Sequence, residues 1–290
     1  MHPAHSIIIF TVTSGLGFGL LAFLGLGQPA VTGWAAFWYF ALAFALSVGG
    51  LVSSTFHLGN PQRAWRAFSQ WRSSWLSREG VLAVVTLAIM GIYAIFAVFF
   101  GQIMPVLGII GAVMALATVF ATSMIYAQMK TVPRWHHWMV PALFMALAVA
   151  GGALLTGHAL LAVILLFVAG VLQTASWSRG DRALADSGST LGTATGLGVR
   201  GTVRAFEPPH TGNNYLLKEM VHVIGRRHAR KLRLIALALM VLAPIVLLLI
   251  PGGWTIIALA FAVHLAGTLA QRWLFFAEAE HVVGLYYGKR

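Results

Sequence analysis

Long apolar runs alternate with short polar connections along this chain. Each run holds about 20 mostly apolar residues, the length that a helix needs to cross a hydrocarbon core of about 30 Å. The runs are Ser6–Leu26, Gly33–Ser54, Glu79–Phe100, Met104–Tyr126, His137–Thr156, His158–Trp177, Leu232–Ile250 and Trp254–Phe276. The pattern predicts an all-α integral membrane protein with eight transmembrane helices, packed as a helical bundle of two four-helix groups.

The connections predict one transmembrane domain over residues 1–290 with one extramembrane loop. Short turns follow the odd-numbered runs, and longer loops follow the second, fourth and sixth. Residues 178–231 form the longest loop, and its segment "YLLKEMVHVIGRRHARKLR" resembles a basic amphipathic helix. That helix would either lie on anionic lipid or dock a soluble subunit. Within the first run, Gly15 and Gly19 form a G-x-x-x-G pair that would let another helix approach closely.

Composition and charge placement support a bilayer as the solvent. Hydrophobic residues make up 59% of the chain and charged residues 9%, so a soluble fold could not hide the apolar surface. All 19 Lys and Arg residues fall on the face that carries the longer loops and both termini. The positive-inside rule places that face in the cytoplasm, with the bacterial inner membrane as the location. The net charge of +12 therefore indicates orientation rather than nucleic-acid binding. No Lys or Arg precedes the first run, so we expect that run to remain as a span.

The absence of cysteine limits the redox chemistry that the chain can carry. Without Cys there are no thiolate ligands for an iron–sulfur cluster and no C-x-x-C-H haem attachment. Haem b would need two histidines facing each other at the same depth, and only His264 lies near the middle of a run. We therefore expect no haem and no iron–sulfur cluster in this chain, and His264 is interpreted as a hydrogen-bonded core residue.

The scarce polar chemistry gathers in residues 54–80, "STFHLGNPQRAWRAFSQWRSSWLSREG". His57 ends the second run and Glu79 begins the third, so a helical hairpin would bring both to similar depth beside a cleft. A histidine can accept a proton near neutral pH and a nearby carboxylate can pass it on. The alternatives are structural. His57 could bond a carbonyl at the interface, and Glu79 could be a first-turn helix acid capped by Ser77.

Three arginines are further candidates for binding. Arg63 and Arg66 lie on one side of a short helical turn with Trp65 between them. They could bind a lipid phosphate, the acidic rim of a partner or the oxygen of a ring headgroup. Arg272, one turn from the end of the eighth run, could neutralise a buried oxygen or extend to the interface.

Three segments resemble the membrane anchor subunit of dimethyl sulfoxide reductase, an eight-span family related to polysulfide reductase anchors. They are "HLGNPQRAWRAFSQWRSSWLSREG", "TVPRWHHWMVP" (Thr131–Pro141) and "EPPHTGNNYLLKEM" (Glu207–Met220). The resemblance implies haem-free oxidation of menaquinol or ubiquinol in anaerobic respiration. Electrons would pass to a four-cluster iron–sulfur subunit and then to a molybdopterin catalytic subunit that reduces an S- or N-oxide. In that family, the residues matching His57 and Glu79 line the quinol site.

Other classes of function stay open from the sequence. A secondary transporter or ion-translocating module would place polar residues and broken helices at the bilayer midplane. A passive membrane tether for a soluble enzyme would ask nothing of His57. A haem-bearing anchor would be revealed by its absorption spectrum.

Overall fold

The computed structural model describes residues 1–56, 58–207, 210, 212, 214–220 and 228–287, and within these ranges it contains helices and no strand. The α-helices are α1 (His5–Gly25), α2 (Gly33–Thr55), α3 (Trp75–Phe99), α4 (Pro105–Ala127), α5 (Met139–Leu155), α6 (Ala159–Gly180), α7 (Ala183–Asp186), α8 (Leu191–Thr195), α9 (Tyr215–Glu219), α10 (Ala229–Leu237), α11 (Ala243–Leu248) and α12 (Gly253–Ala277). The described residues also form three 3₁₀ helices, η1 (Pro61–Phe68), η2 (Gly198–Arg200) and η5 (Val282–Tyr287), and one π-helix, η4 (Ala238–Leu242). The prediction of an all-α protein is confirmed for these ranges.

Seven helices in the described part of the chain are long and apolar enough to cross a membrane. One of them is the continuous stretch Ala229–Leu248, which joins α10, η4 and α11. The expected fifth span is shorter: α5 has 17 residues, about 26 Å at 1.5 Å per residue. Helix α3 begins at Trp75, one turn before the position expected from the sequence.

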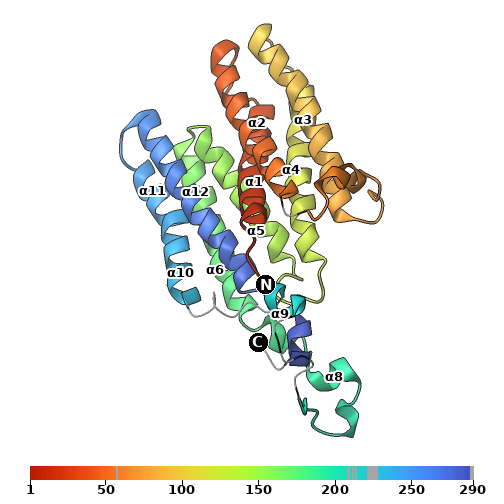
Figure 1. Cartoon of the computed structure of the whole chain (residues 1–290). Helices are drawn as coiled ribbons and strands as arrows, with labels where there is room; N and C mark the ends of the chain where they lie inside the picture. Colours follow the sequence, from red (N-terminus) through yellow and green to blue (C-terminus); the bar gives the residue numbers. More distant parts are fainter. Residues whose placement is uncertain (57, 208–209, 211, 213, 221–227, 288–290) are drawn as a thin grey trace.

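Helix α1 occupies the centre of the molecule (Figure 1) and packs against α2, α4, α5 and α12. Its crossing with α5 is a direct contact between backbones. A Cβ placed on Gly19 would lie 1.9 Å from the Ala148 carbonyl oxygen, and one on Gly152 would lie 2.6 Å from Gly19. Gly15, by contrast, has no atom within 4 Å of such a Cβ. The predicted close approach therefore involves Gly19 and not Gly15.

A proline explains how His264 is held in the core. Pro244 has no N–H, so the carbonyl of Met240, four residues earlier, lacks its usual helical donor. That carbonyl lies in η4, a π-helical turn, and His264 Nδ1 lies 2.7 Å from its oxygen. Since a carbonyl only accepts, Nδ1 carries the proton. The interpretation of His264 as a hydrogen-bonded core residue is confirmed.

The N-terminus and the last described helix, η5, lie on one side of the long helices. Figure 1 shows the N-terminus close to α9, with α8 projecting beyond the ends of the long helices on the same side. The terminal amine of Met1 donates to the carbonyl of Ala279, just after α12. Hydrogen bonds from Tyr286 to Ala194 and from Asn214 to the Tyr287 hydroxyl fasten the 178–231 loop to η5. Of the expected amphipathic helix, residues 221–227 lie outside the described residues.

Candidate functional site

Glu79 is an interior carboxylate. The side chain is 4% exposed, and the Thr122 hydroxyl of α4 donates to its Oε1 at 2.8 Å. Because the N-cap of α3 is Ser74, Glu79 is the fifth helical residue and Ser77 is buried inside the helix. The alternative of a first-turn acid capped by Ser77 is therefore wrong. An acid at this depth is costly, which marks Glu79 as a functional candidate.

A line of hydroxyl groups runs inward from Glu79 between α3 and α4. Thr118 lies one turn from Thr122, and its hydroxyl is 3.1 Å from that of Thr86. Thr118 donates to its own helix at Met114, so Thr86 is the donor in that pair. These groups give the α3–α4 interface a polar interior in an otherwise apolar region.

Arg272 is buried on the other side of the same interior. It is 2% exposed, and its guanidinium carbon lies 3.7 Å from the ring centre of Phe144 and 5.2 Å from that of Phe275. Of the two sequence alternatives, extension to the interface is wrong. Tyr126 of α4 contacts the rings of Phe144 and Phe275. Thr122, one turn earlier on α4, donates to Glu79 and lines the same cavity as Arg272. The structure thus brings Glu79 and Arg272 into one region.

A small cavity lies beside Arg272. It has room for about one water molecule and is lined by Arg272, Thr122 and hydroxyl groups of α1 and α12. It is therefore too small for a quinone ring.

Arg63 and Arg66 lie away from this interior. Both are exposed on η1, a 3₁₀ helix in which residues three apart align on one side, as the sequence predicted. The Arg66 guanidinium lies 5.5 Å from the Trp65 ring. The ring of Phe68 lies against Gly80, so η1 packs on the first turns of α3. His57, the other predicted site residue, lies outside the described residues.

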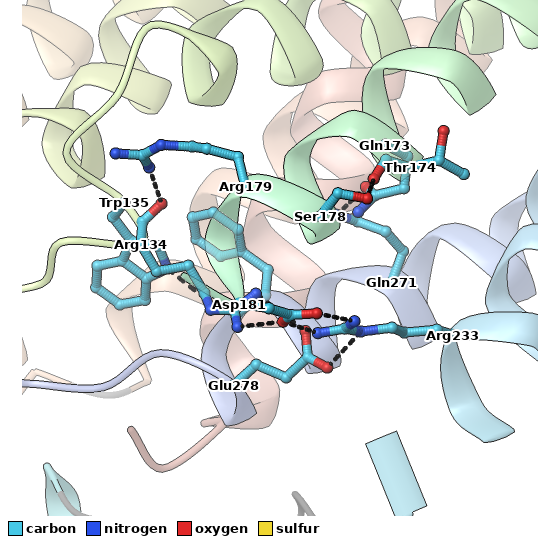
Figure 2. Close-up of polar contacts among 11 residues, drawn as sticks. Arg134, Trp135, Gln173, Thr174, Ser178, Arg179, Asp181, Arg233, Gln271 and Glu278 are labelled. Atoms are coloured by element: carbon cyan, nitrogen blue, oxygen red, sulfur yellow. Dashed lines mark hydrogen bonds and ion pairs between the residues drawn. The ribbon is translucent and has the colours of Figure 1, made fainter. Parts of the chain in front are cut away.

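A second polar cluster joins four elements at the end of the molecule that carries the termini (Figure 2). Asp181 accepts from Arg134 at 2.7 Å and from both terminal nitrogens of Arg233. Glu278, 4% exposed, accepts from Arg233 Nε at 2.7 Å and lies 3.6 Å from Arg134. The cluster holds two positive and two negative charges. We call these four residues the ion cluster.

The ion cluster predicts a specific sensitivity to acid. The hydrogen bonds from Arg233, helped by Arg134, lower the pKa of Asp181 to about 2 from its ordinary 3.8, although partial burial opposes them. Because the folded-state pKa is the lower one, Asp181 contributes stability that is present above about pH 4 and lost as the pH falls toward about 2.

We expect the thermal midpoint of the wild type to fall between about pH 4 and pH 2 more than that of Asp181→Asn. Differential scanning fluorimetry in detergent would measure both. An equal loss in the two proteins would show that Asp181 does not link stability to pH.

The sequence did not reveal several residues of these sites. Thr122 and Tyr126 carry no motif, and their role appears only when α4 is packed against α3. Asp181 falls within the 178–231 loop and Glu278 lies beyond the eighth apolar run, yet both are paired with arginines. The only signal in the sequence was the scarcity of acids, which makes each carboxylate near a span end worth testing.

Comparisons with known proteins agree with these features. Residues 1–176 match the family described as DMSO reductase anchor subunit (DmsC). The chain is 32% identical to a sulfite dehydrogenase subunit of Allochromatium vinosum, with 99% of each chain covered. No solved structure gives a significant match.

Proposed function

The chain belongs to the DMSO reductase anchor subunit family, and on that premise we propose that it oxidises a membrane quinol at Glu79. Membership makes it a multi-pass membrane anchor subunit of a molybdoenzyme complex. The observation that carries the proposal is the buried Glu79 carboxylate, held by Thr122 within the stretch that resembles the quinol motif. A passive tether has no need of an acid at that depth.

The proposed chemistry divides the quinol's protons between two groups of this chain. Oxidation of one quinol to quinone releases two protons and two electrons. Glu79 takes one proton as a general base, and His57 takes the other. Both electrons leave to an iron–sulfur cluster of the partner subunit, because this chain has no cysteine with which to hold one. Arg63 and Arg66, exposed on η1, contact the headgroup, lipid phosphate or the partner.

The proposed architecture completes this scheme. Helix α5 acts as the eighth span, so the helices form two groups of four, α1–α4 and α5–α12. The end that carries the ion cluster and both termini faces the cytoplasm of a bacterial inner membrane. A four-cluster iron–sulfur subunit and a molybdopterin subunit assemble with this chain. Dimethyl sulfoxide or another S- or N-oxide is the terminal acceptor, and the donor is menaquinol or ubiquinol.

A second candidate is the same reaction in reverse. The relative that shares 32% identity is named as a subunit of a sulfite dehydrogenase, and a dehydrogenase supplies electrons rather than consuming them. In that direction Glu79 gives its proton to the reduced quinone. The same residues serve both directions, so the direction depends on the potentials of quinone and partner.

The proposal is tested by purifying the complex through this chain and identifying the other subunits. We expect an iron–sulfur protein and a molybdopterin protein, and quinol-dependent reduction of the clusters. A complex that lacks this chain should accept electrons from a soluble artificial donor but not from quinol. Equal quinol oxidation with and without this chain would refute the proposal. Activity assays of the complex with sulfite and with dimethyl sulfoxide would decide the direction.

A further inference from the structure

Arg272 is an interior cation with unused donors. Its Nε and Nη1 atoms have no hydrogen-bond partner among the described residues, although the side chain is 2% exposed. An unpaired buried charge costs several kcal/mol, and the ring faces of Phe144 and Phe275 carry no oxygen that could accept these N–H groups. Another group must therefore accept these N–H groups and balance the charge of the guanidinium.

The cavity beside Arg272 offers acceptors of one kind. Four hydroxyl groups line it, and each has already given its single proton elsewhere: Ser14 to Phe10 at 2.6 Å, Thr11 to Ile7 at 2.9 Å, Thr268 to His264 at 2.7 Å and Thr122 to Glu79 at 2.8 Å. Their oxygens remain as acceptors. The wall thus presents N–H donors on one side and hydroxyl acceptors on the other.

A water molecule is complementary to this wall. It can accept from one of the unpaired N–H groups of Arg272 and donate to two hydroxyl oxygens, which gives it three partners, within the two to four that buried waters have. The cavity has room for about one such molecule.

Glu79 is the carboxylate that can balance the charge. Of the acidic side chains, Glu79 and Glu278 are each 4% exposed, and Glu278 is engaged in the ion cluster. Glu79 lies four residues from the start of α3, and Thr122 and Arg272 lie five from the ends of α4 and α12. All three helix ends are on the same side, so the residues share a depth of about 6–8 Å.

We infer that this cavity binds one water, which joins Arg272 to the Thr122 hydroxyl and through it to the Glu79 carboxylate. The two interior residues then form a water-mediated ion pair, and Arg272 is a positioning residue that holds Glu79 ionised. The consequence for catalysis rests on the proposed function: an ionised Glu79 is ready to accept a proton from quinol.

The other titratable groups around α3 do not supply this charge. Tyr126 of α4 is neutral when protonated, and Arg63 and Arg66 of η1 are exposed. His5 of α1 is the first residue of its helix, and Tyr39 of α2 lies near the opposite end of the bundle.

The test uses infrared spectroscopy of the complete complex at neutral pH without quinol. The Glu79 carboxyl signal is assigned by its absence in Glu79→Gln. We expect no protonated Glu79 in the wild type and its appearance in Arg272→Gln. A water stretching band that shifts in H₂¹⁸O should be present in the wild type and lost in both Arg272→Gln and Thr122→Val. Thr86→Val, which removes a buried hydroxyl outside the cavity wall, is the matched control and should keep the band.

A wild-type Glu79 that is already protonated, or a water band that survives in Thr122→Val, would overturn the inference. If Arg272→Gln fails to fold, Thr122→Val still decides the matter, because it keeps the size of the side chain and removes the hydroxyl that would bind the water. No quinol is present, so a failure here is distinguishable from a failure of quinol oxidation.

Discussion

Replacing Glu79 by Gln is expected to reduce quinol-dependent turnover of the complex by about 10²–10⁴-fold, the usual contribution of a positioned acid–base group. Glutamine has the same shape and its oxygen can still accept the hydrogen bond from Thr122. It cannot take a proton. Turnover with a soluble artificial donor should stay unchanged, because those electrons enter at the partner subunits. Steady-state assays with both donors measure the contrast.

Glu207→Gln is the control for this substitution. It makes the same chemical change at an exposed residue of the 178–231 loop, and both assays should remain at the wild-type level. If Glu79→Gln retained wild-type quinol turnover, Glu79 would have no part in the reaction, in either direction of electron flow.

The second large effect is expected on folding. Gly19→Ala would place a methyl group 1.9 Å from the Ala148 carbonyl oxygen. This oxygen belongs to the backbone of α5, which cannot move aside as a flexible side chain can. Overpacking of a core costs about 1–3 kcal/mol and occasionally more. Because the obstacle is backbone at the contact between α1 and α5, we expect the upper end of that range. The thermal midpoint and the yield of folded protein in detergent should both fall sharply.

Gly15→Ala is the matched control on the same helix. No atom lies within 4 Å of the added methyl group, and alanine favours helix over glycine by about 1 kcal/mol. Its stability should equal or exceed that of the wild type. Similar losses in the two variants would mean that the α1–α5 crossing is looser than the structure describes.

The sequence predicted the helical class well because apolar length alone decides it. A run of about 20 apolar residues is typical of a transmembrane helix. His264 was identified as a core residue because no second histidine shared its depth. The position of α3 was harder. Trp75 and Leu76 belong to the helix although polar neighbours surround them, and this earlier start turns Glu79 from a first-turn acid into a buried one.

Pairings between distant segments could not be read from the sequence. Asp181 and Glu278 look like ordinary loop and tail acids until α6 and α12 end beside Arg134 and Arg233. For Arg272 the sequence allowed a solvent-exposed position, and the structure shows a buried one. Its distance from the helix end allowed it to extend to water, but the aromatic rings of α5 and α12 enclose it. Which of two such outcomes occurs depends on packing that no local pattern encodes.

The ion cluster and the Glu79–Arg272 region differ in how their charges are balanced. The four charges of the ion cluster neutralise one another, so it fastens α6, α10 and α12 without needing a ligand. Glu79 and Arg272 show no such direct contact, and two nitrogens of Arg272 lack a hydrogen-bond partner among the described residues.

The most direct measurement is a structure of the complete complex with a tightly bound quinol analogue. The account predicts the headgroup within hydrogen-bonding distance of the Glu79 carboxylate, near the start of α3 and η1. An analogue at the opposite end of the molecule, for instance in the open hollow that Gln28 and His158 line, with nothing near Glu79, would contradict it.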